Sequence, residues 1–448
     1  MNGKGDSLFN HELVGIGVGP ANLSLLAALV EDGPAMCRTD TLFLEKKPSI
    51  DWHPALHVDE ARTQIPFLKD LATLRNPCSR FTFTNYLHER RRLLEFAALG
   101  LHRPRRLEYE DYLRWVGGQL SHYIRFDTEA LSIAPIKDGD AVKSLKIEIS
   151  TTTDRGRDVD CIVTQNICLG VGMTPQLPDI LASETDTIIH SARFLPTLHR
   201  FFEQTTRPWR FLVVGGGQTA GEIFSHLLLN YPNAQITGAA RGFLYGGVDA
   251  SYFVNTLYSD GSALDFYHKP TVFKRRVLSD LRRTNHAVVS GDVIERIGML
   301  LYDDKIRGIN RAQVLSYTDV VAIAPTKTGA NVTLCDQSNG TEYHQAFDCV
   351  IFATGYDTAG MEILLEPLAP YLMQDVDGYQ LDADHRLVAK SNLQVGIYLQ
   401  GYASYAHGLT EGTITSVSLR AARIADSLRR HRRKPMQTPI YRSPSGPE

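Results

Sequence analysis

The chain has 448 residues, enough for two or three domains that each surround a core of their own. Hydrophobic residues make up 43% and charged residues 22%, which is typical of a soluble globular protein. The net charge of −3 gives no sign of nucleic-acid or membrane binding. No apolar run is long enough for a membrane span, and the N-terminus does not resemble a signal peptide, so we expect a cytoplasmic protein.

The six cysteines include no C-x-x-C pair and lack the spacing of zinc ligands. We therefore predict reduced thiols and no metal site. Residues 429–448 are rich in proline and are predicted to form a disordered tail.

The first motif that indicates a function is a glycine-rich turn. It lies between an apolar strand, "LVGI", and a helical pattern, "ANLSLLAALVED". Gly15, Gly17 and Gly19 alternate there, and Pro20 suits the first turn of the helix. A strand that turns sharply into a helix presents free amides and the positive end of the helix dipole to a pyrophosphate. The next apolar strand, "DTLFL", ends in Glu45, which can accept the hydroxyl groups of an unphosphorylated ribose. This pattern predicts FAD or NAD rather than NADP.

The same pattern returns about two hundred residues later. The strand "RFLVV" leads through Gly215 and Gly217 into a helix that begins with Gln218 and Thr219. The following strand ends in Arg241, where an enzyme specific for NAD would carry an acid. An arginine can pair with a 2′-phosphate, so we predict NADPH at this site, although an ordinary surface arginine is the alternative.

Two nucleotide sites in one chain predict hydride transfer from NADPH to a bound flavin. The apolar segment "DCVIFATGY" is expected to return the chain to the flavin domain, with Thr354 and Gly355 beside FAD. A disulfide reductase is disfavoured because it needs a cysteine pair near the flavin. Oxygenases of ketones and sulfur are disfavoured as well, because His190 lacks the F-x-G that precedes it in their F-x-G-x-x-x-H signature.

Several segments are similar to those of the flavin-dependent N-hydroxylating monooxygenases, which hydroxylate the side-chain amine of L-ornithine or L-lysine for siderophores. The resemblance covers about residues 12–428 and rests on "GIGVGPANLSL", "QIPFLKDLATLRNP", "EYEDYLRW", "VVGGGQTAGE", "IFATGY" and "YLQGYASYAHGL". The segment "QIPFLKDLATLRNP" is the most specific, because no general requirement of folding explains so long a run.

The resemblance implies that NADPH reduces FAD, that oxygen then forms a C4a-hydroperoxyflavin, and that the neutral amine of L-ornithine attacks it. No acid–base catalytic residue is expected; the protein excludes water and positions the amine. The resemblance also implies a homo-oligomer, often a tetramer. The alternative to an enzyme is a protein that binds nucleotides without catalysing a reaction.

By resemblance, Gln64 positions the flavin and the nicotinamide, and Lys69 pairs with the substrate carboxylate. The remaining residues expected near FAD are Trp52, His53, His407, Gly408 and Leu409. The remaining residues expected near the substrate are Asn255, Asn285 and Thr410. A solvated lysine, a core aromatic residue, a turn histidine and capping asparagines are the structural alternatives.

Three departures from the family pattern leave the choice of amine open: His286 replaces a tyrosine, Thr410-Glu411 replaces serine-aspartate, and Pro66 replaces a small polar residue. The "TN-x-x-VV" pattern favours ornithine. Lysine hydroxylated at N6, a diamine such as putrescine, and histamine are the alternatives.

The predicted fold class is α/β, with two dinucleotide-binding, Rossmann-like domains, the NADPH domain inserted into the FAD domain, and a small substrate-binding region. The expected FAD domain covers residues 1–204 and 341–428. The expected NADPH domain covers 205–340, and its segment of about 245–310 contributes to the substrate pocket.

Overall fold

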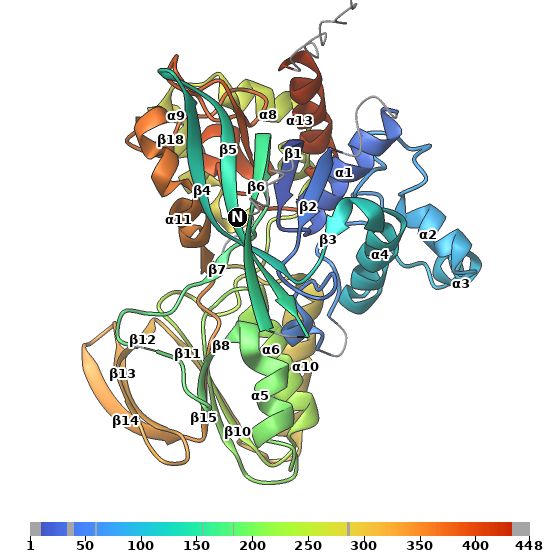
Figure 1. Cartoon of the computed structure of the whole chain (residues 1–448). Helices are drawn as coiled ribbons and strands as arrows, with labels where there is room; N and C mark the ends of the chain where they lie inside the picture. Colours follow the sequence, from blue (N-terminus) through green and yellow to red (C-terminus); the bar gives the residue numbers. More distant parts are fainter. Residues whose placement is uncertain are drawn as a thin grey trace, which may run out of the picture.

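The computed structural model describes residues 10–33, 40–58, 61–154, 156–181, 183–284 and 287–431. Figure 1 shows two lobes, each built around its own sheet, with a short connecting region between them. The predicted α/β class with two Rossmann-like sheets is confirmed. No helix in this part of the chain is long and apolar enough to span a membrane.

The first lobe contains a seven-stranded sheet in which β1 lies between β2 and β6, parallel to both. The strands β4, β5 and β6 extend it as a long antiparallel ribbon, and β19 pairs with β6 in parallel. Its strands are β1 (Asn10–Ile16), β2 (Thr41–Leu44), β3 (Ile124–Arg125), β4 (Thr128–Asp138), β5 (Ala141–Thr153), β6 (Gly156–Leu169) and β19 (Gly396–Leu399).

Each face of this sheet covers a separate apolar core. One core contains side chains of α1, α2, α4 and α13, and the other packs the sheet against α11. The helices of this lobe are α1 (Pro20–Glu31), α2 (Phe83–Glu89), α3 (Leu93–Ala98), α4 (Arg106–Gln119), α11 (Ala359–Leu365) and α13 (Val417–His431). A small hairpin of β17 (Gln374–Asp375) and β18 (Gly378–Tyr379) follows α11.

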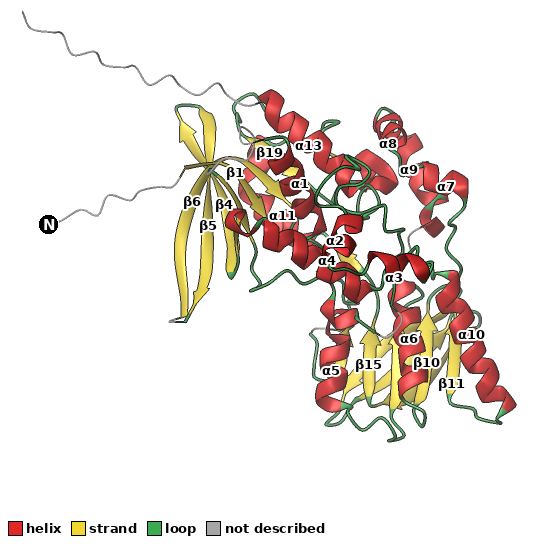
Figure 2. Cartoon of the chain, turned by 90° about the vertical axis from the view of Figure 1, so that its right-hand side faces the viewer, coloured by secondary structure: helices red, strands yellow, loops and turns green. Residues whose placement is uncertain are grey.

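The second lobe contains a five-stranded parallel sheet in the order β11-β10-β9-β15-β8. Its strands are β8 (Ile188–His190), β9 (Arg210–Val214), β10 (Gln235–Ala240), β11 (Ala312–Ser316) and β15 (Cys349–Phe352). Three helices cover one face (Figure 2), and an antiparallel three-stranded sheet covers the other (Figure 1). These elements are α5 (Phe194–Phe201), α6 (Gln218–Asn230), α10 (Gly291–Ile306), β12 (Thr318–Pro325), β13 (Ala330–Asp336) and β14 (Thr341–Phe347).

The sheets divide the chain differently from the expected boundaries. Both β8 and β15 were expected in the FAD domain, but they pair in the second sheet, where β15 lies between β9 and the edge strand β8. The chain passes between the lobes where β7 (Thr174–Pro175) pairs with β16 (Tyr356–Asp357).

The expected pocket segment of about 245–310 also divides in two. Its last helix, α10, packs on α6 and belongs to the second lobe. Its earlier helices, α8 and α9, contact α12 and the 3₁₀ turn η6 of the first lobe. These elements are α7 (Tyr252–Thr256), α8 (Asp260–Tyr267), α9 (Thr271–Asp280), α12 (Ser404–His407) and η6 (Gly408–Thr410).

Candidate active site

The first glycine turn has the shape that a phosphate requires. Gly17 has φ +82°, and a Cβ there would lie 2.5 Å from the carbonyl oxygen of Gly170, so only glycine fits. A Cβ on Gly19 would meet nothing within 4 Å, and α1 begins after Gly19 with no side-chain capping bond. The first amides of α1, which follow Pro20, therefore face open space where an anion can bind.

Gly15 lies inside β1 rather than in the turn. A Cβ there would lie 2.1 Å from the Phe43 ring, so this glycine allows β1 and β2 to pack closely. Asn22, which was not among the predicted residues, occupies the third position of the fingerprint, where a glycine is usual. Its buried amide donates to the Gly17 carbonyl at 2.7 Å and accepts from Gln400 at 2.7 Å. The G-x-G-x-x-N spacing could have identified it.

Glu45 lies beside this turn, one residue beyond β2. One carboxylate oxygen accepts from the Val18 amide at 2.8 Å, and the other accepts from the Lys47 amide at 3.1 Å. A carboxylate has further lone pairs, so Glu45 can still accept hydroxyl groups of a ribose.

The second glycine turn repeats this geometry. Gly215 has φ +139°, and a Cβ there would lie 2.3 Å from the Ala353 carbonyl oxygen. The helix α6 begins after Gly217 with no side-chain capping bond, and Thr219 is half-buried in its first turn. Arg241 is exposed one residue beyond β10, where a 2′-phosphate could reach it.

Gln218 differs from its neighbours in this turn. Its side-chain oxygen accepts from the Ser290 amide at 2.8 Å, and its nitrogen donates to Glu222 at 3.0 Å and to the Ser290 hydroxyl at 3.1 Å. The side chain is therefore engaged within the protein, and the predicted contact of Gln218 with NADPH stays a prediction for its backbone amide.

Thr354 and Gly355 stabilise the crossing between the lobes. The Thr354 hydroxyl donates to the Gln176 carbonyl, and the Gly355 carbonyl accepts from His190 Nε2 at 2.9 Å. His190 Nδ1 accepts from the Ala192 amide at 3.1 Å, so this buried histidine has a structural role.

Trp52 and His53 lie between the lobes on the side of α4. The Trp52 ring packs on Tyr109, with centroids 5.2 Å apart. The His53 side chain is exposed, and its backbone has φ 53°. Gln64 is also exposed. These exposed side chains are accessible to a cofactor.

Lys69 and Asn255 meet although 186 positions separate them in the chain. Lys69 Nζ donates to Asn255 Oδ1 at 3.0 Å and lies 5.7 Å from the centre of the Tyr258 ring. Burial lowers the pKa of Lys69, and the nearby positive charge of Arg103 lowers it further. Asn285 and His286 lie outside the described residues. Of the predicted substrate residues, Lys69 and Asn255 are therefore brought into direct contact.

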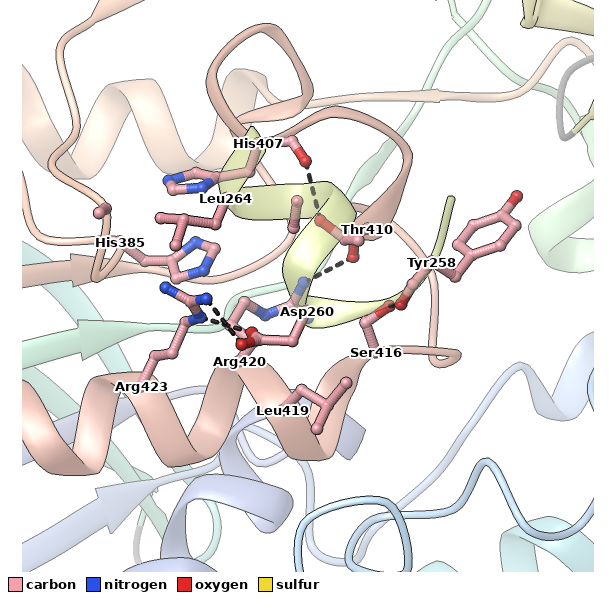
Figure 3. Close-up of a pocket in the computed structure, with 12 residues that line it drawn as sticks. Tyr258, Asp260, Leu264, His385, His407, Thr410, Ser416, Leu419, Arg420 and Arg423 are labelled. Atoms are coloured by element: carbon pink, nitrogen blue, oxygen red, sulfur yellow. Dashed lines mark hydrogen bonds and ion pairs between the residues drawn. The ribbon is translucent and has the colours of Figure 1, made fainter. Parts of the chain in front are cut away.

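His407 lines a pocket next to α8 and α13, shown in Figure 3. Its buried ring stacks on His385, with centroids 3.9 Å apart, and on Tyr267, at 5.2 Å. The Thr410 hydroxyl donates to the His407 carbonyl at 2.9 Å. Both side chains, which were expected to contact ligands, are thus engaged within the protein. The pocket is lined by Tyr258, Asp260, Ala263, Leu264, Ala383, His385, His407, Thr410, Ser416, Leu419, Arg420 and Arg423.

Gly408 and Leu409 continue this segment. Gly408 has φ +74°, and a Cβ there would lie 3.1 Å from the Phe266 ring of α8. Leu409 is half-buried. The conformation of the segment therefore depends on a glycine packed against an aromatic ring.

Glu411 forms a buried cluster under this segment. It accepts from Arg420 at 3.2 Å and from the Gly401 amide at 3.0 Å, and it lies 3.2 Å from His385 Nδ1. Burial alone would raise the pKa of Glu411, but Arg420 and then His385 outweigh it and hold the pKa well below its usual range. Arg420 also donates to the Thr410 carbonyl at 3.1 Å, so the cluster fixes the backbone of residues 408–411.

Comparison with known proteins identifies the family of this chain. A family model described as L-lysine 6-monooxygenase/L-ornithine 5-monooxygenase matches residues 10–358. The chain belongs to this family. This membership confirms the predicted enzyme class, a flavin-dependent N-hydroxylating monooxygenase.

Individual monooxygenases of this family match over nearly their full length. The L-ornithine N(5)-monooxygenase of Pseudomonas aeruginosa is 34% identical over 94% of both chains. The structure of the Kutzneria sp. 744 ornithine N-hydroxylase, with reduced FAD, NADP⁺ and L-ornithine, has a TM-score of 0.88 at 33% identity and covers 94% of this chain and 99% of that one. The L-lysine 6-monooxygenase of Pseudomonas syringae has a TM-score of 0.80 at 30% identity, with the same coverage.

The buried His407 predicts that this monooxygenase loses stability in mild acid. Burial, followed by the neighbouring His385, lowers the pKa of His407 to about 3. Between this value and the ordinary pKa of about 6.5, the unfolded chain binds a proton that the folded chain does not, so the free energy of unfolding falls as the pH falls. We expect this histidine to account for a loss of about 2 kcal/mol between pH 7.5 and pH 5.

Urea unfolding of the wild type and of His407→Phe at both pH values measures this effect. The comparison is between pH values within each protein, so a constant effect of the substitution on packing cancels. The variant should lose about 2 kcal/mol less than the wild type. An equal loss in both proteins would show that His407 is not the group responsible.

Proposed function

We propose that this protein hydroxylates the side-chain amine of L-ornithine at N5, with FAD and NADPH as cofactors. The amine, O₂, NADPH and a proton become the hydroxylamine, NADP⁺ and water, which balances atoms and electrons. The ornithine hydroxylases among its relatives and the fit of two nucleotides to its two glycine turns support this proposal.

The contact between Lys69 and Asn255 is the observation that supports an amino acid, rather than a simple amine, as the substrate. An amino acid presents a carboxylate and an ammonium group on the same carbon. Lys69 supplies a positive charge to the carboxylate, and the Asn255 amide next to it can serve as donor or acceptor. A pocket for an amine without a carboxylate would not need this lysine.

The two glycine turns fit two nucleotides. In each, a glycine with positive φ leaves room for a backbone that a Cβ would block, and the following helix begins without a side-chain cap. FAD, when bound, supplies the activation of oxygen with electrons from NADPH. For FAD we propose contacts from Gly17, Gly19, Pro20, Glu45, Trp52, His53, Gln64, Gly408 and Leu409. For NADPH we propose contacts from Gly215, Gly217, Thr219 and Arg241, with Asn285 and Thr410 near the substrate.

The side chains of the protein orient the substrate and do not exchange protons with it. Lys69 and Asn255 would bind the amino-acid end, which would leave the distal amine free to react at a bound flavin. The cluster around Glu411 fixes the backbone of residues 408–411. We propose that this segment borders the site and limits the access of water. The reacting amine must be neutral in order to attack, so we expect activity to rise with pH.

L-lysine is the second candidate, because the family includes enzymes for both amino acids. Both substrates satisfy Lys69 and Asn255 and differ by one methylene in the reach of the distal amine. Hydroxylamine formation from ornithine, lysine, putrescine and histamine, measured together with NADPH consumption, separates the candidates. We expect the highest ratio of hydroxylamine to NADPH with ornithine; a higher ratio with lysine would reassign the substrate.

Replacing Arg241 by alanine is expected to raise the KM for NADPH about 10- to 100-fold. A charge-assisted bond to a 2′-phosphate is lost, whereas NADH has no such phosphate and should keep its KM. Initial rates with both nucleotides measure the change, and Arg307→Ala, at the exposed end of α10, is the control. An equal change for NADPH and NADH would contradict the assignment.

We further propose that the hydroxylamine enters a hydroxamate siderophore and that the enzyme acts in the cytoplasm, where NADPH is available. The homo-oligomer implied by the family resemblance stays a prediction.

A further inference from the structure

We propose that Arg106 and Glu222 form a positioning pair that sets the NADPH lobe against the flavin lobe and thereby controls hydride transfer. The inference builds on the proposed use of FAD and NADPH. It concerns the placement of the two cofactors relative to each other, which neither glycine turn determines alone.

The pair connects the two lobes directly. Arg106 begins α4 in the first lobe, and Glu222 lies on α6 in the second. Arg106 Nη2 lies 3.0 and 2.9 Å from the two carboxylate oxygens of Glu222. The exposed fractions of the two side chains are only 12% and 3%. At this burial, a charge that loses its partner is strongly destabilised, so the pair resists separation.

On the flavin side, the pair holds the segment that carries Trp52 and His53. Arg106 Nη1 donates to the Leu56 carbonyl at 2.6 Å. One turn further along α4, Glu110 accepts from the Trp52 amide at 3.1 Å. Leu56 also packs in the apolar core of the second lobe. This segment is therefore fixed at both ends by α4 and lies where the lobes meet.

On the nucleotide side, the pair reaches the helix that begins at the second glycine turn. Gln218, the first residue of α6, donates to Glu222 Oε1 at 3.0 Å and is bonded to Ser290. The amides proposed to bind the NADPH phosphates belong to this same first turn of α6. One continuous set of hydrogen bonds thus extends from Leu56 through Arg106, Glu222 and Gln218 to Ser290.

The consequence follows from the geometry of hydride transfer. The reaction requires reacting atoms about 3–3.5 Å apart, and a displacement of 1 Å can cost about 100-fold in rate. Because α6 carries the donor and the 52–57 segment borders the acceptor, a loosened Arg106–Glu222 pair shifts one cofactor relative to the other. Binding of either cofactor alone depends on its own glycine turn and should change little.

Arg106→Gln, Glu222→Gln and the double variant form a cycle that tests the proposal. With FAD bound, each single variant should reduce the limiting rate of anaerobic flavin reduction by NADPH about 10- to 100-fold. The double variant should be no slower than the slower single variant, because the two residues act as a unit. Flavin content and reduction by dithionite should match the wild type. Amide hydrogen exchange, a measurement independent of activity, should become faster at residues 54–57 and in the first turn of α6.

The pair Arg275–Asp377, with side chains 54% and 18% exposed and a shortest contact of 2.6 Å, lies away from the contact between the lobes and supplies the control. Arg275→Gln should leave flavin reduction and hydrogen exchange at wild-type values. If Arg106→Gln does not fold, Arg106→Lys replaces it; lysine keeps the charge but cannot hold Leu56 and Glu222 together, so a smaller reduction in the same step is expected.

Wild-type reduction rates in both single variants, effects that multiply in the double variant, or a parallel loss of FAD would overturn the proposal. A wild-type protein whose flavin NADPH cannot reduce would instead contradict the proposed function, so the two failures can be told apart.

Discussion

Replacing Lys69 by methionine is expected to reduce kcat/KM for L-ornithine about 30- to 150-fold, the effect of losing a charged hydrogen bond of about 2–3 kcal/mol. Lys69 Nζ lies beside Asn255 Oδ1, where a substrate carboxylate would be paired. Methionine keeps most of the length of the side chain without its charge. The rate of flavin reduction by NADPH should stay unchanged, because neither glycine turn is touched. Steady-state kinetics combined with anaerobic flavin reduction measures both effects.

Putrescine makes this prediction specific, because it has the same distal amine but no carboxylate. The preference of the wild type for ornithine over putrescine should largely disappear in Lys69→Met. Lys327→Met, in the exposed turn between β12 and β13, is the control and should keep the wild-type preference. A variant that loses activity equally towards both amines would show that Lys69 does not recognise the carboxylate.

Replacing Glu411 by methionine is expected to lower the free energy of unfolding by about 3–5 kcal/mol. The substitution leaves the buried Arg420 without its carboxylate and the Gly401 amide without its acceptor. Adding Arg420→Met should restore part of the loss, since replacing both members of a buried ion pair by apolar residues is often nearly neutral. Urea unfolding of the three proteins at neutral pH measures these differences.

A surface pair provides the comparison for this result. Asp265 on α8 and Lys269, two residues beyond the end of this helix, lie 2.8 Å apart with 69% and 40% of their side chains exposed. Asp265→Ala should therefore cost less than about 1 kcal/mol. A cost for Glu411→Met no larger than this would mean that the buried cluster does not fix the 408–411 segment.

The features that could be predicted from the sequence are those that depend on residues close together in the chain. Gly17 and Gly215 both need a conformation and a clearance that only glycine has, so the turns around them are visible in a single sequence. The helix predicted to begin at Gln218 agrees with the start of α6 for a similar reason, since it follows such a turn. The enzyme family could be predicted because "QIPFLKDLATLRNP" is too specific to serve folding alone.

Features that depend on distant partners could not be predicted in this way. The apolar runs of β8 and β15 do not indicate which of two sheets they join, so the domain boundaries were misplaced. The bonds between Gln218 and Ser290 likewise depend on the packing of α10 on α6, which joins positions 72 residues apart. The stacking of His407 on His385 also joins segments that no sequence pattern connects.

The ratio of hydroxylamine formed to NADPH oxidised, with L-ornithine and the FAD-loaded protein, tests the central claim most directly. The proposed function predicts nearly equal amounts of the two, together with a yellow protein that retains its flavin on purification. A protein that binds no flavin, or NADPH oxidation that yields only hydrogen peroxide with every amine, would contradict it.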